Sequence, residues 1–534
     1  MPNLTLFAII ERMLYTCTIK LGGDEMDDRI WIIIAFIMYL GIMLAIGFRY
    51  YGRTKNSEEY FLGGRKLSGW VAALSAQASD MSGWLLMGLP GAIYALGTGQ
   101  IWIAVGLALG TAINWIFIAA RLRRYTIVAG NALTLPEYFQ NRFHDTKGIL
   151  KIASSLFIMI FFLVYTASAF SAGAQLFQTI FGIEYTYALI IGAVVILSYT
   201  FLGGFMAVCW TDFIQGLLML FAILIVPAVA LNLMGGLGQL NSTGTPHFLN
   251  PLYNGGERIT AVSLVSQLAW ALGYLGMPHI LIRFMAIKNN REVRKSRVIA
   301  ITWVILSLGA ACAIGVIGRA FLPNLGTDNK EKVFISMILE IFKGNPLMLL
   351  IGGILLCGVL AAIMSTADSQ LLVTASSISQ DLYKGVVNKN ASDKSLLRLS
   401  RIVTIVVAAI AFCIALDPKS SVMDLVSNAW AGFGATFGPV VLLSLFWKRG
   451  NKIGAAFGMI GGGLTVIIWD YIKFGGATLA ASTGLYSLLP GFLVGLVAFF
   501  VVSLLTKEPE EAIQREFALV ASGNDVEIDK TLES

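Results

Sequence analysis

A carboxylate stands in the middle of an apolar stretch of the sequence. Asp80 lies in "SAQASDMSGWLLMGLPG" (residues 75–91), between small or apolar residues and shortly before glycines and a proline. An ionised aspartate at the centre of a bilayer costs about 2.5–3.5 kcal/mol on insertion scales, so it normally faces a cavity, an ion or a partner. A capping role at the end of a broken helix is the alternative, because aspartate is favoured at helix ends.

The glycines and the proline predict that the helix is interrupted just after this aspartate. A break at this point would free the backbone carbonyls of Ala78 and Met81. Unpaired carbonyls at membrane depth are tolerated only where they are buried in protein or line a polar cavity. Small hard cations prefer oxygen ligands. Asp80 beside these carbonyls therefore predicts a cation site.

A second set of oxygen atoms is found in "LAAIMSTADSQLLV", residues 360–373. One helical face of this stretch carries residues at i, i+3, i+4 and i+7, namely Ala362, Ser365, Thr366 and Ser369. Hydroxyls in membrane helices also bond to their own backbone or pack helices together, so this stretch alone leaves both alternatives open. Asp368 adds a carboxylate, either as a further ion-binding group or as a polar helix–helix contact.

Long apolar blocks position these residues. The chain has 534 residues, of which 57% are hydrophobic and only 13% charged, whereas soluble domains carry about 25% charged residues. We expect an all-α polytopic membrane protein with about 13 transmembrane helices, each long enough to cross a hydrocarbon core of about 30 Å. The blocks cover approximately residues 28–50, 69–95, 99–120, 150–181, 185–203, 204–234, 260–286, 297–322, 346–384, 398–416, 422–447, 452–473 and 483–506.

The charged residues predict the orientation of the chain. The net charge is +7, and short clusters such as "RYYGRTK", "RLRRY", "KNNREVRKSR" and "KRGNK" lie between the apolar blocks. Alternating crossings put all these clusters on one side, as the positive-inside rule requires, which argues against nucleic-acid binding. We expect residues 1–27 to be an extracellular leader without a cleavable signal, 28–506 the transmembrane domain, and 507–534 a solvated cytoplasmic tail. The scattered cysteines and three histidines favour neither disulfides nor a metal site.

Two groups of five predicted spans resemble each other in one respect. Residues 69–234 and 260–447 each begin with a Gly/Pro-interrupted segment, "SDMSGWLLMGLPG" in the first and "ALGYLGMPH" in the second. An odd number of helices in each group makes the second inverted relative to the first, and paired interrupted helices indicate a binding site at the membrane midplane.

Several longer segments resemble the sodium:solute symporter family, and within it the proline carriers. They are "LSAQASDMSGWLLMGLPGA", "LTLPEYF", "YTFLGGFMAVCWTD", "GYLGMPHILIRFMA", "AWAGFGATFGPVVLLSLFWKR" and "WKRGNKIGAAFGMIGG". The resemblance covers about residues 28–506 and implies a fold like that of the bacterial leucine transporter, a 5+5 inverted repeat with extra helices at both ends. It implies Na⁺ as the coupling ion and no organic cofactor.

The resemblance also assigns residues to sites. Sodium would be held by the carbonyls of Ala78, Met81 and Ala362 and by Ser365 and Thr366, with Asp80 assisting its entry or binding. The substrate would meet Ser82, Gly83, Trp84, Tyr165, Trp270, Tyr274 and Pro278. Trp270 and Tyr274, at i and i+4, would offer aromatic walls to a compact ring, although packing or lipid-facing aromatics show the same spacing. Gating or coupling would involve Arg65, Asp212 and Asp368, the last a departure from the proline-carrier pattern.

The predicted function is sodium-coupled uptake of L-proline across the cell membrane, with the lipid bilayer as the only other partner. The alternative within the same fold is a symporter for another amino acid, pantothenate or a sugar. A channel would show a repeated filter segment and an enzyme a catalytic cluster, and neither pattern is visible. No ATP-binding P-loop occurs either, and no obligatory protein partner is indicated.

Overall fold

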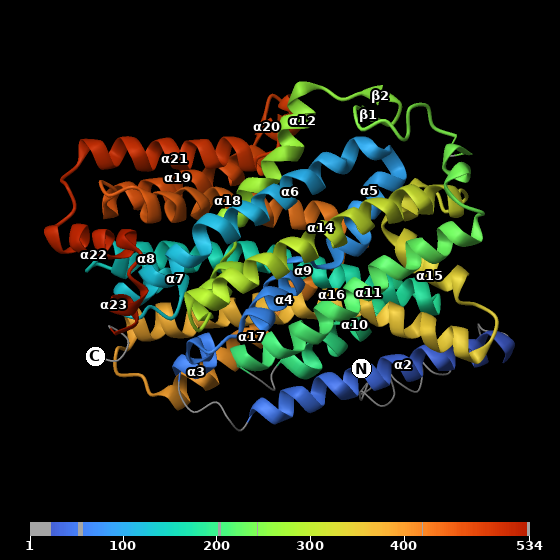
Figure 1. Cartoon of the computed structure of the whole chain (residues 1–534), viewed down its shortest axis with the longest axis horizontal. Helices are drawn as coiled ribbons and strands as arrows, with labels where there is room; N and C mark the ends of the chain where they lie inside the picture. Colours follow the sequence, from blue (N-terminus) through green and yellow to red (C-terminus); the bar gives the residue numbers. More distant parts are fainter. Residues whose placement is uncertain (1–22, 52–56, 201–203, 243, 419, 531–534) are drawn as a thin grey trace, which may run out of the picture.

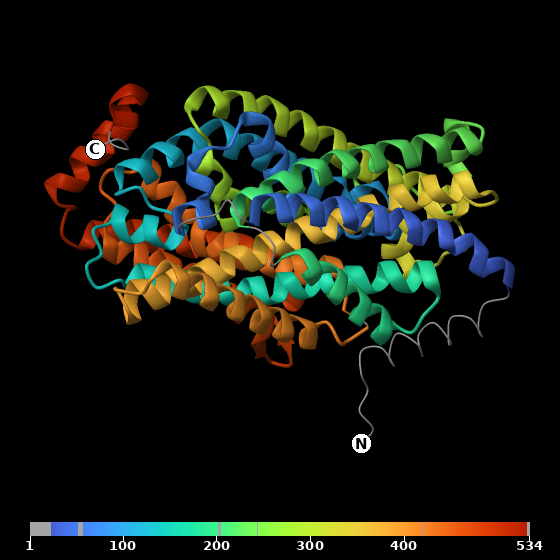
Figure 2. The same ribbon diagram turned by 90° about the horizontal axis from the view of Figure 1, so that it is seen from below.

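The computed structural model describes residues 23–51, 57–200, 204–242, 244–418 and 420–530. Most helices run along the long axis of the molecule and form one bundle (Figure 1). Helix α2 lies along the outside of this bundle in both views (Figures 1 and 2). The predicted leader, residues 1–27, falls mostly outside the described residues.

The helices follow one another with short connections. The α-helices are α2 (Gly23–Tyr51), α3 (Ser57–Leu62), α4 (Gly69–Asp80), α5 (Leu89–Leu96), α6 (Ile101–Ile113), α7 (Ala119–Val128), α8 (Leu135–Arg142), α9 (Ile149–Phe181), α10 (Tyr185–Thr200), α11 (Phe205–Leu233), α12 (Ala261–Leu268), α13 (Pro278–Ala286), α14 (Asn290–Phe321), α15 (Val333–Ile341), α16 (Pro346–Ser376), α17 (Asp393–Ile414), α18 (Val422–Phe446), α19 (Lys452–Tyr471), α20 (Leu479–Thr483), α21 (Leu488–Leu505), α22 (Glu511–Ser522) and α23 (Asp525–Lys530). Segments with π-helical geometry are η2 (Trp84–Gly88), η4 (Asn114–Ile118) and η8 (Ser377–Val387). The 3-10 segments are η1 (Gly63–Arg65), η3 (Thr98–Gln100), η5 (Leu237–Ser242), η6 (Ala269–Leu275) and η7 (Thr327–Lys332).

Two short antiparallel hairpins lie in loops between helices and were not predicted from the sequence. Strand β1 (Tyr253–Asn254) pairs with β2 (Glu257–Arg258), and β3 (Lys473–Phe474) pairs with β4 (Ala477–Thr478). Each hairpin turns through two glycines with positive φ, Gly255–Gly256 and Gly475–Gly476, a conformation that glycine adopts without steric cost.

The predicted membrane spans are present. Ten described helices are long and apolar enough to cross a membrane, and α12 with α13, bent by 42°, makes an eleventh. The two remaining predicted spans, 69–95 and 185–203, correspond to the broken pair α4–α5 and to the shorter helix α10. Two boundaries differ from the prediction, because the span predicted at 99–120 continues to Val128 and the span predicted to begin at 483 begins at Leu488.

The two broken helices run in opposite directions, as an inverted repeat requires. Where the first pair begins, the second ends, because the Leu67 N–H donates to the Ala286 carbonyl (3.2 Å). Where the first pair ends, the second begins, because the Gly255 N–H donates to the Leu96 carbonyl (2.8 Å), six residues before α12. Helices α2, α19 and α21 are the additional spans outside the two repeats.

Each break has a local cause. Met81 has φ −82° and ψ 71°, outside the helical region, and ends α4. In the second broken helix, a Cβ on Gly276 would lie 2.3 Å from the carbonyl oxygen of Phe433, so α18 approaches the backbone more closely than any side chain permits. Glycine is therefore required where α18 crosses the second break.

The C-terminal tail is not a solvated appendage, so that expectation is wrong for its described part. Helices α22 and α23 lie against the end of the bundle beside α7 and α8 (Figure 1). Their apolar residues Ile513, Val520 and Ile528 are buried. Asp525 forms an ion pair with Arg124 of α7 (2.7 Å). The tail therefore has an amphipathic pattern that docks it, which its high charge content obscured.

Candidate functional site

A cluster of uncharged oxygen atoms joins α4 to α16. The Ser365 hydroxyl donates to the carbonyl of Ala78 (2.8 Å) and lies 3.2 Å from the carbonyl of Ala362. The Thr366 hydroxyl lies 3.1 Å from the same Ala362 carbonyl. All four residues are fully buried. The structure thus brings these predicted sodium-site residues together, with Met81 directly in the break of the helix.

The chemistry and spacing of this cluster fit a small monovalent cation. Two carbonyls and two hydroxyls are hard ligands without formal charge, which suits a singly charged ion. Oxygen ligands about 2.4 Å from a central ion and at right angles to each other lie about 3.4 Å apart. The observed separations of 2.8–3.2 Å would need to widen by only a few tenths of an ångström.

Asp80 is the last residue of α4 and is completely buried. Its Oδ2 accepts a hydrogen bond from the hydroxyl of Tyr274 (2.6 Å) on the second broken helix. Its Oδ1 accepts none from any described residue. One carboxylate oxygen is thus fixed across the two breaks while the other is left to a ligand, and a purely capping role does not explain this arrangement.

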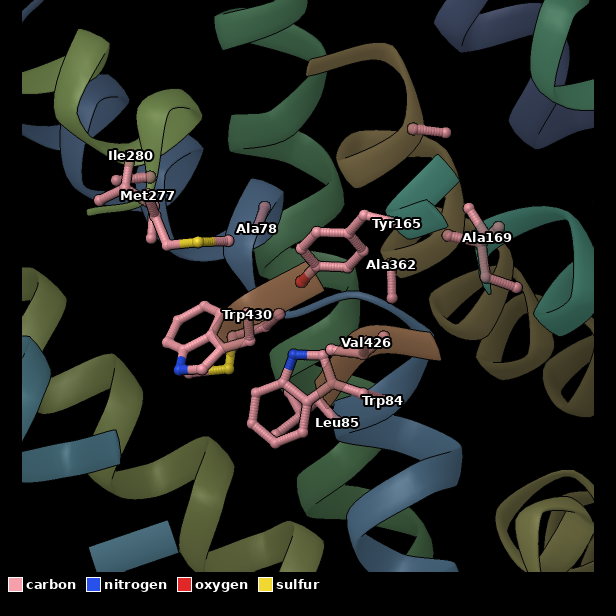
Figure 3. Close-up of a cluster of buried hydrophobic side chains, with 14 of the residues drawn as sticks. Ala78, Trp84, Leu85, Tyr165, Ala169, Met277, Ile280, Ala362, Val426 and Trp430 are labelled. Atoms are coloured by element: carbon pink, nitrogen blue, oxygen red, sulfur yellow. The ribbon is translucent and has the colours of Figure 1, made fainter. Parts of the chain in front are cut away.

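The backbone carbonyl of Asp80, freed by the break, is satisfied by side chains. It accepts from the indole N–H of Trp84 (3.2 Å) and lies 3.4 Å from the Tyr165 hydroxyl of α9. In Figure 3 the Tyr165 hydroxyl points toward the space between Ala78 and the indole rings of Trp84 and Trp430. Tyr165 and Trp84 therefore belong to the same site as the sodium-site carbonyls.

Aromatic rings form one wall of this site. Trp270 lies 6.4 Å from Trp84 between ring centroids, 6.2 Å from Trp430 and 5.3 Å from Tyr486. Tyr274 meets Trp430 edge-on at 4.9 Å, and the Trp430 N–H donates to the Trp270 carbonyl (2.9 Å). The predicted residues Trp270 and Tyr274 thus face the first break rather than lipid. The sequence analysis missed Trp430 and Tyr486, although the quoted "AWAGFGATFGP" segment contains Trp430.

The other predicted substrate residues lie at the two breaks. Ser82 is buried, and its hydroxyl lies 3.4 Å from the N–H of Trp84. A Cβ on Gly83 would lie 2.8 Å from Cβ of Ala172, so α9 packs tightly against the unwound segment. Pro278 begins α13 and is buried. Their roles toward a substrate stay predictions.

A second polar cluster contains an arginine that the sequence analysis missed. Arg283 of α13 forms a fully buried ion pair with Asp212 of α11 (2.9 Å). The guanidinium also donates to the Ser75 hydroxyl (3.0 Å) and to the Ser369 hydroxyl (2.6 Å). Asp212 is therefore not interfacial, and Ser369 does not join the sodium cluster. An arginine inside the span predicted at 260–286 was the signal that indicated a buried partner.

Arg65 and Asp368 do not contact the sodium cluster in any hydrogen bond that the described residues form with it. Arg65 donates to the Met285 carbonyl (2.6 Å), the Asn131 side chain (2.8 Å) and the Ala132 carbonyl (3.0 Å), and thereby connects α13 to the end of α7. Asp368 is fully buried on α16. Their predicted gating or coupling roles stay predictions.

Known proteins with similar sequences cover nearly the whole chain. The chain is 46% identical over 495 residues to a sodium/proline symporter of Escherichia coli, covering 91% of this chain and 95% of that protein. It is 43% identical over 493 residues to the osmoregulated proline transporter OpuE of Bacillus subtilis, covering 92% and 98%.

Two solved structures share the fold at low sequence identity. A Na⁺-coupled sialic acid symporter, in a substrate-bound outward-open state, superposes with a TM-score of 0.72 at 19% identity, covering 90% of this chain and 99% of that one. A nucleobase-cation-symport-1 family transporter, in a closed conformation, gives 0.52 at 11% identity, covering 86% and 98%. A sequence model of the sodium:solute symporter family matches residues 60–462, and the chain belongs to this family.

Proposed function

We propose that this protein takes up L-proline together with Na⁺ by alternating access. The relatives named above, one a sodium/proline symporter and one a proline transporter, support this substrate. The observation that carries the proposal is the hydrogen bond of 2.8 Å between Ser365 and the Ala78 carbonyl. It joins the broken helix α4 to α16 through the oxygen atoms that suit a sodium ion.

In this mechanism, sodium stabilises the unwound end of α4 against α16. The carbonyls of Ala78, Met81 and Ala362 and the hydroxyls of Ser365 and Thr366 hold the ion. Because the Ala78 carbonyl belongs to the same break as Ser82 and Trp84, binding the ion orders the substrate residues. Sodium and proline then raise each other's affinity by the same factor, as linkage requires.

The substrate residues suit a small zwitterion with an apolar ring. Helix ends at the two breaks offer partial charges and free backbone groups to the carboxylate and the ammonium. The free Oδ1 of Asp80 supplies a negative charge close to both the cation and the ammonium. The rings of Trp84, Trp270 and Tyr274 would enclose the pyrrolidine ring.

The sodium gradient supplies enough free energy for concentrative uptake. One Na⁺ moving down about 100 mV and a tenfold gradient releases about 3.7 kcal/mol in total. That sustains roughly a 500-fold accumulation of a neutral solute at about 1.4 kcal/mol per decade.

We further propose that the protein spans the cell membrane with its N-terminus outside and its tail inside. Asp525 of the tail binds Arg124, which belongs to the basic "RLRRY" cluster. Its carboxylate also accepts from Asn290, the residue just before the basic run "REVRKSR". Basic clusters and tail thus share one end of the bundle, which the positive-inside rule assigns to the cytoplasm.

Uptake of radiolabelled L-proline into proteoliposomes tests the proposal. An imposed inward Na⁺ gradient should drive uptake, and replacing Na⁺ by choline should abolish it. Ser365→Ala should lose most Na⁺-driven uptake. Ser307→Ala is the matched control, because Ser307 is equally buried but bonds only to its own helix, at the Val304 carbonyl (3.2 Å).

Equal uptake in choline would contradict sodium coupling. Absence of proline uptake, with sodium still binding to the protein, would contradict proline as substrate. A panel of other amino acids, pantothenate and sugars would then identify the solute.

A further inference from the structure

The polar face of α16 does not end at the sodium cluster. Beyond Thr366 it continues through Gln370, Thr374, Ser377 and Asp381, spaced four, four, three and four residues apart. This spacing keeps the side chains on one helical face. All of them are buried, with exposed fractions of 1% or less. A continuous row of buried polar side chains is costly in a membrane helix and needs an explanation.

Helix α9 forms the opposite wall of this row. Thr166 of α9 lies 3.2 Å from the Gln370 amide oxygen, between Oγ1 and Oε1. The two helices run antiparallel, since Ser155 and Asp381 lie eleven residues from this contact on the two chains. A second contact confirms the register, because a Cβ on Gly385 would lie 3.3 Å from Nζ of Lys151, each fifteen residues from the pair. Ser155 is therefore at the level of Asp381.

Polar atoms along this row lack partners among the described residues. Gln370 Nε2, Ser377 Oγ, Asp381 Oδ2 and, opposite, Ser155 Oγ are buried atoms with no hydrogen bond. A buried polar group without a partner costs about 1–3 kcal/mol. Such groups are rare in folded proteins, so several of them along one helix face indicate that a ligand passes there.

Asp381 is the strongest of these groups. Its Oδ1 accepts a hydrogen bond from the Thr134 hydroxyl (2.7 Å) at the start of α8, while Oδ2 is unpartnered. The charged groups that act on it are Glu137 of α8 and Lys151 of α9, and no ion pair within 4.0 Å joins the described residues to it. The carboxylate is thus oriented on one side and open to a cation on the other.

The backbone around Asp381 is also unusual. Residues Ser377–Val387 form an eleven-residue π-helical segment, η8, which continues α16. Short π-helical segments within α-helices occur frequently at functional sites. The segment packs against α8, α9 and α17, so it is enclosed by helices at the end of the bundle where the tail lies.

We propose that Asp381, with Ser377, Thr134 and Ser155, forms a second and transient site for a monovalent cation on the route from the sodium cluster to the tail end of the bundle. This inference rests on the proposed sodium-coupled function. The two sites lie fifteen residues apart on α16, or about 22 Å at 1.5 Å per residue. A carboxylate placed there attracts the ion away from the uncharged cluster. It thereby accelerates release on the tail side.

The test compares net uptake with exchange for Asp381→Asn in proteoliposomes. The amide keeps the size of the side chain and a bond to Thr134 but removes the charge. Net proline uptake into Na⁺-free vesicles requires sodium release, and we expect it to fall about tenfold. Counterflow of proline with equal, saturating Na⁺ on both sides does not require that release, and we expect it to stay within twofold.

Ser377→Ala and Ser379→Ala make the comparison specific. Ser377→Ala removes an unpartnered hydroxyl, leaves the fold intact, and should slow net uptake about threefold with normal counterflow. Ser379→Ala is the control, because its hydroxyl bonds only to the Ala375 carbonyl one turn back (2.6 Å). We expect no change there. If Asp381→Asn does not fold, Ser377→Ala carries the test alone.

Each remaining outcome is decisive. Net uptake and counterflow that fall together would overturn the inference, because the defect would then not be in sodium release. Unchanged net uptake in Asp381→Asn and Ser377→Ala would overturn it as well. Failure of the wild-type protein to show Na⁺-driven uptake would instead contradict the proposed function, so the two failures are distinguishable.

Discussion

Two polar clusters flank helix α4, and they are satisfied in different ways. The cluster around Arg283 contains a carboxylate, two hydroxyls and an arginine that pairs with all three. The cluster around Ser365 contains carbonyl and hydroxyl oxygens and no positively charged side chain. The first cluster holds its cation covalently as part of the chain, whereas the second requires a cation from solution. This difference separates a permanent connection between helices from a connection that sodium makes and breaks.

The largest expected effect is at the permanent cluster. Arg283→Met leaves Asp212 as a buried carboxylate without its countercharge, which costs about 3–5 kcal/mol. We expect a large drop in the melting temperature of the purified protein, measured with and without Na⁺. The drop should be the same in both conditions, because this cluster does not bind the ion.

The double variant Arg283→Met with Asp212→Asn provides the control. It removes both charges, so it should recover much of the lost stability. A double variant no more stable than the single one would show that the ion pair is not the source of the effect.

The next largest effect is at the sodium-dependent cluster. Thr366→Ala removes one of its two hydroxyl oxygens, and a hydrogen bond or ligand contact to a charged group contributes about 1.5–3 kcal/mol. The Na⁺ concentration for half-maximal proline binding should therefore rise about 10- to 100-fold. Stability in the absence of Na⁺ should change little. An unchanged sodium dependence would remove Thr366 from the site.

Ser75→Ala sharpens the comparison with a smaller change. Ser75 donates to Asp212 (2.7 Å) and accepts from Arg283, both within the permanent cluster. We expect a loss of about 0.5–1.5 kcal/mol in stability and no shift of the sodium dependence. Thermal unfolding and sodium titration of proline binding would measure both. A sodium shift as large as that of Thr366→Ala would mean that the two clusters act as one.

The smallest effect concerns the exposed ion pair of the tail. Partial burial raises the pKa of Asp525, but hydrogen bonds from Arg124 and Asn290 and the charge of Arg124 outweigh it and hold the pKa below its usual value. A lowered pKa means that the stabilisation is present above the usual pKa of about 3.9 and is lost as the pH falls through the lowered value.

For such an exposed pair the contribution is below about 1 kcal/mol. Asp525→Asn should make the tail modestly easier to cleave with a protease at neutral pH. Wild-type protection should stay constant from pH 8 to about pH 5. A rise in wild-type cleavage within that range would contradict this assignment.

The sequence predicted those features that depend on local pattern. Apolar length located the spans, and glycines near Asp80 and Gly276 located both breaks. The periodicity of α16 and the family resemblance together placed Ser365 and Thr366 opposite the first break. In each of these cases the residues concerned lie close together in the sequence, or the family motif relates them.

The features that the sequence did not predict are contacts between distant segments. Arg283 and Asp212 are 71 residues apart, and neither residue carries a pattern that names the other as partner. Trp430 reaches Trp270 across 160 residues for the same reason. The docking of the tail depends on buried positions such as Ile513 and Val520, which are spread among charged residues and lower the apparent hydrophobicity.

The most direct test of the central claim is the binding of radiolabelled L-proline to the purified protein over a range of Na⁺ concentrations. Sodium should raise the proline affinity of the wild-type protein, and proline should raise the sodium affinity by the same factor. In Thr366→Ala this coupling should appear only at about 10- to 100-fold higher Na⁺. Proline affinity that is identical in sodium and in choline would contradict the claim that the oxygen cluster between α4 and α16 couples the ion to the substrate.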